Sequence, residues 1–419
     1  MSRRIQIFGW RAHPARLLLP AGLLWLLPIV SARGAAPGAQ PECPIEPPPS
    51  AEPAPAAPSG WFAAWNRMKA DLEEKTGTSL SICADEHYQY VVSGPGEGRG
   101  RDVFWWTATV RQRLWDGARL VVCARGNSDN NTPPDGITPF VGSDLNLDWA
   151  AYETECLYLA NVYLEQRLLD DRLLLAAGKM NFPNRFDTND VAGWDFFSCH
   201  LARNAAFPHR YHTVGGLVKY APTDRVYVQA GVMDAQGIRS ETGLNTAFHG
   251  EDNLISMYEL GLDTCLAGRP GTCRLDLWYD PQPLSRHDGG GSTRDNVGFG
   301  VNCDQMVTDR IGVFLRYGWN DGDVRTFGHY WSLGGTWLGP LENRSRDVLG
   351  FGFGQGIHSH SYRRANNAAS SESIFEVYYK VHVTEYCSLL FDLITLMNAG
   401  PDPDNDVGVI PGVRLKFVF

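Results

Sequence analysis

Residues Ser373–Glu385 read SIFEVYYKVHVTE and alternate between apolar and polar side chains. In an extended strand, successive side chains point to opposite faces. One face would carry Phe375, Val377, Tyr379, Val381 and Val383. The other face would carry Glu376 and Lys380, and a basic residue turned toward lipid at mid-depth costs about 2 to 4 kcal/mol. The pattern therefore predicts a strand with one face toward hydrocarbon and the other toward water.

Segments of this kind recur about sixteen times over residues 80–419, and RIGVFLRYGW at Arg310–Trp319 is a second clear example. The connections alternate in length: the odd-numbered ones hold roughly 9 to 33 residues and the even-numbered ones roughly 2 to 8. With the strand ends read from the sequence in this way, every even-numbered connection is shorter than every odd-numbered one. This asymmetry is typical of an all-β, 16-stranded antiparallel transmembrane β-barrel with short periplasmic turns and long external loops.

The N-terminal part divides into three segments. Residues 1–36 are expected to be a signal peptide, because arginines precede an apolar run, Leu17–Val30, that is too short to span a bilayer as a helix. Residues 37–60 are rich in Pro and Ala and favour an extended linker. Residues 61–78 predict a short amphipathic helix with Ser59 as its N-cap, acting as a periplasmic lid or arm or covering the rim of the barrel.

Charged residues predict the character of the lumen. Ten basic residues fall on inward faces of the clearest strands: Arg111, Arg113, Arg167, Lys219, Arg274, Arg310, Arg316, Lys380, Arg414 and Lys416. The acidic residues assigned to the same faces are Glu165, Glu259, Asp263, Asp276 and Glu376. Because charged rings set pore selectivity, this excess predicts a basic lumen that disfavours cations. A balanced wall of paired charges is the alternative.

The nine cysteines of this exported chain predict oxidised pairs with Cys43 left over, and Cys265 and Cys273 flank a turn that they would staple. Free thiols packed as small apolar residues are the alternative. The scattered spacing is unlike a metal site, so no metal or other cofactor is expected.

The terminal segment, VIPGVRLKFVF, ends on an aromatic residue, Phe419. Such an ending resembles the signal read by the barrel-assembly machinery of bacterial outer membranes. The expected location is the outer membrane, and the expected partners are its lipid and that machinery. We expect no nucleic-acid partner, and a homo-oligomer is left open.

Five blocks, taken in order, resemble the carbohydrate-selective porin family typified by OprB. They are Tyr163–Asp187, Phe196–Gly237, Cys273–Pro281, Asp309–Trp319 and Gly408–Phe419. The resemblance covers about residues 61–419 and implies a sixteen-stranded channel through which small carbohydrates diffuse. The cysteines and the long proline-rich leader depart from the family pattern.

The longest connection, from about Met180 to His212, is where an inward-folded loop would narrow the pore. Planar charged and amide groups suit sugar hydroxyls, and an aromatic face suits the sugar ring. The candidate pore-lining residues are Arg111, Arg113, Glu165, Arg185, Asp187, Asn189, Trp194, Arg203, Arg210, Lys219 and Arg316. An ordinary solvated surface loop has the same composition.

Three weaker motifs remain. HSHSYRR at His358–Arg364 has the residues of a metal site or of a Ser/His catalyst, but its spacing indicates no third ligand. SDLNLDW at Ser143–Trp149 lacks the ligand spacing of an EF-hand and is assigned no role. GFGFGQG at Gly350–Gly356 predicts a glycine face against which backbone or a folded loop packs closely.

The sequence therefore predicts a passive channel for small sugars rather than an enzyme. A general or anion-preferring small-solute porin is the nearest alternative. Two functions of other classes are an outer-membrane hydrolase using Ser359 and its flanking histidines, and an exported β protein that never enters the membrane.

Overall fold

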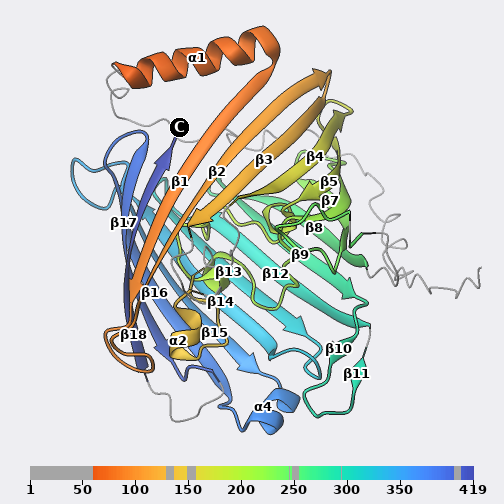
Figure 1. Ribbon diagram of the computed structural model, residues 1–419, viewed down its shortest axis with the longest axis vertical. Coiled ribbons are helices and arrows are strands. Elements are labelled where there is room, and N and C mark those ends of the chain that lie inside the picture. Colours follow the sequence, from red (N-terminus) through yellow and green to blue (C-terminus); the bar gives the residue numbers. More distant parts are fainter. Residues whose placement is uncertain are drawn as a thin grey trace, which may run out of the picture. The chain divides into compact units, whose positions relative to one another are not determined.

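The computed structural model describes residues 60–128, 136–148, 157–244, 246–247, 254–293, 295–400 and 407–419. The signal peptide and the linker predicted from the sequence lie outside these residues, as do Ser59 and Cys43. Sixteen antiparallel strands form a closed barrel in which each strand pairs with its neighbours in the chain (Figure 1). Strands β1 and β18 close it, in a register that runs from Cys83 opposite Val418 to Gln89 opposite Gly412.

The barrel strands are β1 (Thr78–Tyr90), β2 (Gly100–Trp115), β3 (Ala118–Ser128), β4 (Tyr158–Leu168), β5 (Leu173–Met180), β6 (Thr213–Tyr220), β7 (Val226–Asp234), β8 (Leu254–Leu266), β9 (Arg269–Asp280), β12 (Asn296–Met306), β13 (Ile311–Asn320), β14 (Phe327–Leu338), β15 (Val348–His358), β16 (Ser371–His382), β17 (Cys387–Met397) and β18 (Val407–Val418). The helices are α1 (Trp61–Thr76), α2 (Thr138–Val141), η1 (Phe182–Asn184), α3 (Cys199–Ala202) and α4 (His360–Asn366).

The connections depart from the predicted alternation at one place. The periplasmic turn at Gly339–Asp347 is longer than the external connection at Asp321–Thr326, so the rule that every turn is shorter than every loop is wrong. In that turn Arg344 binds the Asp347 carboxylate through Nε at 2.7 Å, so the extra residues form an ordered structure. One external loop also contains a small hairpin, β10 (Leu284–Ser285) with β11 (Ser292–Thr293).

The two faces of the strands are those that the alternation predicted. Leu315 is 51% exposed whereas its neighbour Arg316 is 0% exposed, and Phe375 is 40% exposed whereas Glu376 is 0% exposed. Apolar side chains therefore cover the outside, and charged ones such as Arg316 and Glu376 are enclosed. Arg310, predicted on an inward face, lies instead in the exposed turn before β13. A slip of one residue would exchange the two sets, so the register is strongly specified.

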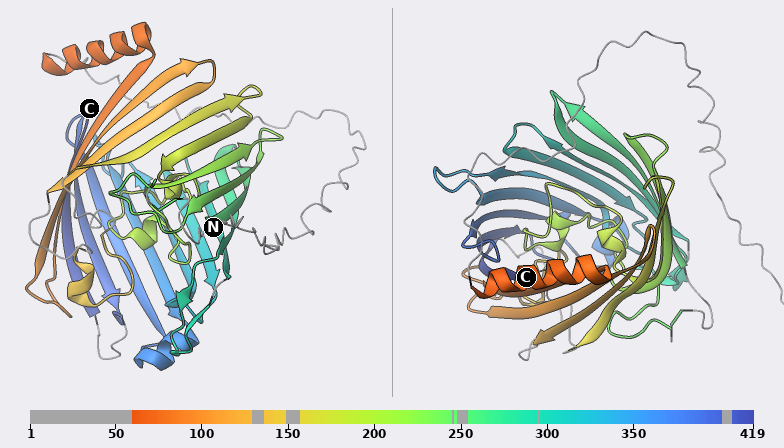
Figure 2. Two further views of the ribbon diagram at one scale, coloured as in Figure 1. Left: turned by 45° about the vertical axis from the view of Figure 1, so that its right-hand side comes forward. Right: turned by 90° about the horizontal axis from the view of Figure 1, so that it is seen from above.

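Helix α1 lies at the end of the barrel where the chain enters β1 (Figures 1 and 2). It ends at Gly77, whose left-handed conformation (φ 71°) lets its N–H donate to the carbonyl of Glu73. The Phe62 ring stacks on Tyr386 with centroids 4.4 Å apart, and the Trp61 ring meets Phe419 at 6.1 Å. The helix thus covers part of the periplasmic rim. In the described part of the chain, no helix has the length and hydrophobicity to cross a bilayer.

The predicted disulfide between Cys265 and Cys273 is wrong. Cys273 on β9 is bonded instead to Cys303 on β12, which lies directly opposite it in the register. Cys265 is one residue from the end of β8 and is opposite Pro270, so it has no cysteine partner there. The bond links neighbouring strands on the outer face, where sequence spacing gives no sign of it.

Candidate pore constriction

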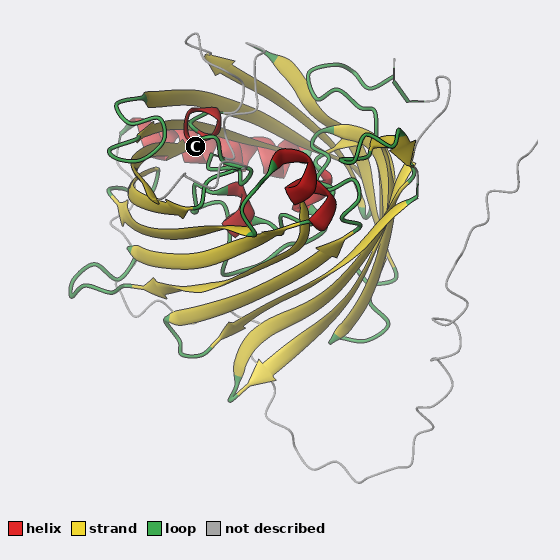
Figure 3. Cartoon of the chain, turned by 90° about the horizontal axis from the view of Figure 1, so that it is seen from below, coloured by secondary structure: helices red, strands yellow, loops and turns green. Residues whose placement is uncertain are grey.

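The connection at residues 181–212 lies inside the barrel (Figures 2 and 3). It leaves β5 and returns to β6, and its helix α3 packs on β15. Strand β15 is eight strands from β5 in either direction around the sixteen-stranded barrel. The constriction loop, as we call residues 181–212, therefore spans the full width of the lumen.

Glycines on the inner wall make room for the constriction loop. A Cβ built on Gly352 of β15 would lie 3.1 Å from both Leu201 Cδ1 and Phe196 Cε1. A Cβ on Gly318 of β13 would lie 2.5 Å from the Ala206 Cβ. The glycine face predicted in β15 is thus the surface on which the tip of the loop rests.

Arg316 anchors the constriction loop to β13. Its side chain is fully buried, and Nη1 donates to the carbonyl of Leu201 at 2.6 Å while Nη2 donates to that of Ala192 at 3.2 Å. Its Nε lies 3.5 Å from Asp187 Oδ1, so the buried guanidinium has a carboxylate partner. Removing one partner of such a buried pair leaves an uncompensated charge, which is strongly destabilising.

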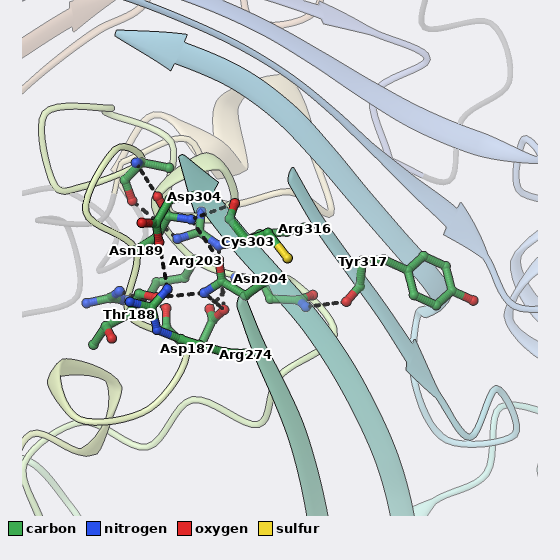
Figure 4. Close-up of polar contacts among 12 residues, drawn as sticks. Asp187, Thr188, Asn189, Arg203, Asn204, Arg274, Cys303, Asp304, Arg316 and Tyr317 are labelled. Atoms are coloured by element: carbon green, nitrogen blue, oxygen red, sulfur yellow. Dashed lines mark hydrogen bonds and ion pairs between the residues drawn. The ribbon is translucent and has the colours of Figure 1, made fainter. Parts of the chain in front are cut away.

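Asp187 organises the first half of the loop (Figure 4). Its Oδ2 accepts the Asn204 backbone N–H at 2.7 Å, and its Oδ1 accepts from Asn302 Nδ2 of β12 at 3.0 Å. Asn189 also binds Asn302, through Nδ2 to Oδ1 at 2.7 Å. Asp187 has a left-handed backbone (φ 53°), which Asp tolerates better than most residues. Its buried carboxylate therefore fixes a sharp bend against the wall.

A second anchor joins the loop to β16 and β18. Glu376 accepts the backbone N–H groups of Phe197 at 2.6 Å and Ser198 at 3.1 Å. Asp195 accepts from Lys380 Nζ at 3.0 Å and from Arg414 Nη2 at 2.8 Å. The inward charges of these two strands thus hold the loop from the side opposite its origin.

The loop between β3 and β4 braces α3. The carbonyl of Asn146 accepts from the Cys199 N–H at 3.0 Å and from Ser198 Oγ at 3.2 Å. The Asn146 N–H donates to His200 Nδ1 at 2.9 Å. Because Nδ1 accepts this bond, the neutral His200 ring carries its proton on Nε2.

The constriction loop buries two histidines in their neutral form. Burial lowers the pKa of His200 to about 3. Burial, followed by the positive charge of Arg203, lowers the pKa of His209 to about 3. Both rings are therefore uncharged at neutral pH in the docked loop.

A cavity of about 940 Å³ lies between the loop, the wall from β6 to β9 and the periplasmic turns that follow β4 and β6. Its lining includes Thr188 and Asp190 from the loop, and Lys219, Tyr227 and Arg274 from the wall. Lys219 Nζ lies 3.7 Å from the centroid of the Tyr227 ring. Hydroxyl, carboxylate and cationic groups therefore face one space beside an aromatic ring.

This cavity is not basic. Aspartates outnumber its basic residues, since Asp170, Asp171, Asp190, Asp224 and Asp263 line it together with Arg172, Lys219 and Arg274. The predicted basic lining overlooked the aspartates of the periplasmic turns and of the loop, because it counted only strand residues. It also overlooked inward carboxylates on the strands, such as Asp304, which lies 2.6 Å from Arg274 Nη1.

The predicted site residues separate into groups. Asp187, Asn189, Arg203 and Arg316 are buried and hold the constriction loop in place. Trp194 belongs with them, since the Arg203 guanidinium lies 4.5 Å from the centroid of its ring. These residues shape the constriction rather than expose their polar groups to it.

Three predicted residues lie nearer to open space. Arg185 binds Glu165 through Nη2 at 2.9 Å and keeps part of its side chain exposed. Lys219 lines the cavity described above. Arg210 is half-buried at the end of the loop, where burial lowers the pKa of its guanidinium and the Asp280 carboxylate opposes that effect.

Arg111 and Arg113 lie elsewhere. Arg113 is at the periplasmic end of β2, where its backbone N–H donates to the Gly77 carbonyl beside α1 at 2.9 Å. Arg111 is on the same strand, two residues before Arg113. The cavity residues that sequence reasoning did not place at the site are Thr188, Tyr227, Asp263, Thr272 and Arg274, whereas Asp190 was recognised as part of the loop. Asp263 and Arg274 were recognised as inward-facing, but only the path of the loop shows where the open space remains.

The residues considered for a hydrolase have other roles. Ser359 is the N-cap of α4, and its Oγ accepts the Tyr362 N–H at 3.2 Å. His358 Nε2 faces Asp144 instead of Ser359. Within the described residues, Ser359 Oγ has no histidine partner.

The family model for the carbohydrate-selective porin, OprB family, matches residues 112–419, well over half of the chain. The chain belongs to the OprB family. It is a porin of the bacterial outer membrane. Porin AaxA of Chlamydia abortus is 21% identical over 368 residues, which cover 85% of this chain and 74% of that protein. Porin AaxA of Chlamydia pneumoniae is 23% identical over 265 residues, which cover 62% of this chain and 58% of that protein.

Solved structures share the fold of this OprB-family porin. The high-pH structure of Pseudomonas putida OprB matches with a TM-score of 0.77 at 18% identity, covering 87% of this chain and 99% of that one. The outer-membrane channel DcaP of Acinetobacter baumannii matches with a TM-score of 0.53 at 11% identity, covering 82% and 97%.

Proposed function

We propose that this porin passes small carbohydrates by passive diffusion, and that the space between the constriction loop and strands β6 to β9 selects them. The supporting observation is the cavity of about 940 Å³, whose lining combines several polar groups with the Tyr227 ring. Ligand sites of about 300 to 1,000 Å³ with a few placed polar groups are typical of small-molecule recognition.

The chemistry of the lining suits a hydroxyl-rich neutral solute. Thr188 and Thr272 hydroxyls donate and accept, the aspartates accept, and Lys219 donates. A sugar offers both donors and acceptors on every face, and its C–H surface packs on aromatic rings. The mixture of charges favours a neutral solute, because an ion of either sign meets like charges as well as opposite ones.

A general or anion-preferring porin is the alternative, and the surplus of aspartates in the cavity argues against anion preference. A cavity of this charge is expected to repel small anions at low salt more than it retards neutral solutes.

Liposome swelling tests the proposal. Pure protein is reconstituted, and swelling rates are compared for neutral sugars of increasing size and for gluconate and glucosamine as charged sugars of hexose size. We expect neutral hexoses to enter faster than gluconate and faster than a neutral polyol of equal size. Rates that follow size alone would show a general porin, and preferred entry of gluconate would show an anion-selective one.

Two variants localise the selectivity. Lys219→Met removes a donor from the cavity, and a hydrogen bond worth about 1 kcal/mol predicts about fivefold less discrimination between a hexose and a polyol. Arg310→Met, in an exposed periplasmic turn outside the cavity, is the matched control and should behave as the wild type. Equal behaviour of both variants would place the selectivity elsewhere in the lumen.

A further inference from the structure

Residues from two of the weaker sequence motifs meet at the external end of the barrel. His358 ends β15, Glu372 is near the start of β16, and Asp144 belongs to the loop between β3 and β4. One ligand atom from each of the three side chains lies within 4.8 Å of the other two. Asp144 is 214 residues from His358 in the chain, so only the fold brings the set together.

The three groups are largely enclosed. The His358 side chain is 0% exposed, Glu372 is 0% exposed, and the Asp144 side chain is 21% exposed. Among the described residues, no Lys or Arg forms an ion pair with either carboxylate. Two carboxylates and one histidine thus lie close together in a place that retains access to the outside through Asp144. Burying such charges without compensation is costly.

The hydrogen bonds of His358 determine which nitrogen is free. Nδ1 lies 2.9 Å from the carbonyl oxygen of Ala369, which only accepts, so Nδ1 carries a proton. Nε2 then points at Asp144 Oδ2, 3.1 Å away, which is also an acceptor when ionised. In a neutral ring with its proton on Nδ1, the Nε2 lone pair is therefore directed at Asp144. A ring nitrogen held by a backbone carbonyl, with the other left free, is the usual arrangement of a metal-bound histidine.

Neighbouring groups fix the other two side chains. Tyr362 OH donates to both oxygens of Asp144, at 3.0 and 2.8 Å. Glu372 accepts from the hydroxyl of Ser143 and from the Asp144 N–H, the latter at 3.0 Å. The His358 ring stacks on Phe327 with centroids 5.1 Å apart. The arrangement is therefore held before any ligand arrives.

We propose that Asp144, His358 and Glu372 bind a divalent transition metal, most suitably Zn²⁺. Ligand atoms around tetrahedral zinc lie about 3.4 Å apart, given bonds of about 2.0 to 2.2 Å, and the 3.1 Å between Nε2 and Oδ2 is close to this. Imidazole favours zinc over calcium or magnesium, which prefer oxygen ligands. Three protein ligands leave a fourth position for water or for a solute group.

The metal would brace the constriction. Leu145 and Leu147 are fully buried, so the segment that carries Asp144 and Asn146 is packed against the interior. Asn146 holds α3 through the bonds described above, two residues from the proposed ligand Asp144. Fixing Asp144 to the ends of β15 and β16 therefore limits the motion of the segment that supports the tip of the constriction loop. This inference is independent of the solute that the pore carries.

Metal binding to the detergent-purified, refolded porin tests the proposal. After treatment with EDTA and dialysis, Zn²⁺ is titrated by calorimetry at pH 7.5, and bound zinc is counted by mass spectrometry. We expect one Zn²⁺ per chain at micromolar concentration. The variants His358→Asn, which keeps a donor for Ala369, and Glu372→Gln should each weaken binding by about a hundredfold, at least as much as loss of a supporting group does. His360→Asn, in α4 and exposed, is the matched control and should bind as the wild type.

X-ray absorption spectroscopy at the zinc edge tests the ligand set on the wild type alone. The spectrum should show one imidazole among light-atom ligands. Heat-modifiable mobility on gels confirms that each variant is a folded barrel. The proposal is overturned if the wild type binds no zinc at micromolar concentration, if His358→Asn and Glu372→Gln bind as tightly as the wild type, or if the spectrum shows no imidazole. A proton on Nε2 then accounts for the geometry.

Discussion

The carbonyl of Leu201 accepts a hydrogen bond from Arg316 Nη1 at 2.6 Å, although the two residues are 115 positions apart in the chain. Leu201 is in α3 at the tip of the constriction loop, and Arg316 is on β13 across the lumen from the strands where that loop begins. Through this bond and the ion pair to Asp187, one buried guanidinium holds both halves of the constriction loop in place.

Replacing that guanidinium should release the loop. We expect Arg316→Met to leave Asp187 buried without its cation, which costs about 3 to 5 kcal/mol of docking free energy. Single channels in planar bilayers should then show larger and noisier conductance than the wild type. Arg310→Met is the control, and a conductance trace identical to the wild type in both variants would show that other contacts hold the loop.

The glycine face of β15 gives a second prediction. Gly352→Ala places a Cβ 3.1 Å from Leu201 and Phe196 side-chain atoms, so the loop must shift at an overpacking cost of about 1 kcal/mol. Gly408→Ala on β18 is matched to it, because its nearest neighbour, Leu396 Cβ, is 3.8 Å away. Hydrogen exchange of residues 196–204 should accelerate in the first variant only. Equal exchange in both would mean that the loop does not rest on this surface.

Acid should loosen the constriction loop. His200 and His209 have a pKa of about 3 in the docked loop, whereas an exposed histidine has a pKa of about 6.5. The docked loop is therefore fully stable above pH 6.5. As the pH falls toward 3, the displaced loop takes up protons that the docked loop does not, so docking weakens by about 1.4 kcal/mol per pH unit for each histidine.

Hydrogen exchange of the loop at several pH values, corrected for intrinsic rates, measures this effect. The double variant His200→Asn/His209→Gln keeps amide groups near the present hydrogen bonds and should lose most of the acid sensitivity. His360→Asn should retain it. Unchanged sensitivity in the double variant would assign the effect to the buried carboxylates of the wall.

The disulfide gives a fourth prediction. Cys273 and Cys303 are 30 residues apart, and closing a loop of this length stabilises a protein by about 3.6 kcal/mol. The variant Cys273→Ser/Cys303→Ser should therefore unfold at lower urea concentration than the wild type, with Cys387→Ser as the free-cysteine control. Peptide mapping under non-reducing conditions should show this pair, and a Cys265–Cys273 peptide would contradict the assignment.

The barrel could be predicted from the sequence because lipid imposes a simple rule on every strand. Val313 and Leu315 face outward and Arg316 faces inward for the same reason in any such barrel. The path of the constriction loop could not be predicted, because it depends on contacts such as Asn189 with Asn302, 113 residues apart. The length of the connection and the glycines of β15 were the signs of an inward-folded loop that the sequence offers.

The balance of charge in the lumen also depends on partners that side-chain alternation does not show. Side-chain alternation shows that Arg274 points inward, but not that Asp304 on the next strand binds it. The motif around His358 likewise showed no third ligand, because Asp144 and Glu372 come from other segments. Pairwise partners across a barrel are set by register, which a single strand does not reveal.

The aromatic contact at the periplasmic rim constrains the order in which α1 and the barrel strands assemble. Tyr386 is in the turn between β16 and β17, and Phe419 follows β18, so the surface that receives Phe62 exists only when the last strands stand beside the first. Helix α1 is synthesised before the strands, but it can pack on Tyr386 and Phe419 only after β18 has been synthesised. Packing of α1 therefore indicates that the barrel has closed, and a chain arrested before closure would leave the helix unpacked.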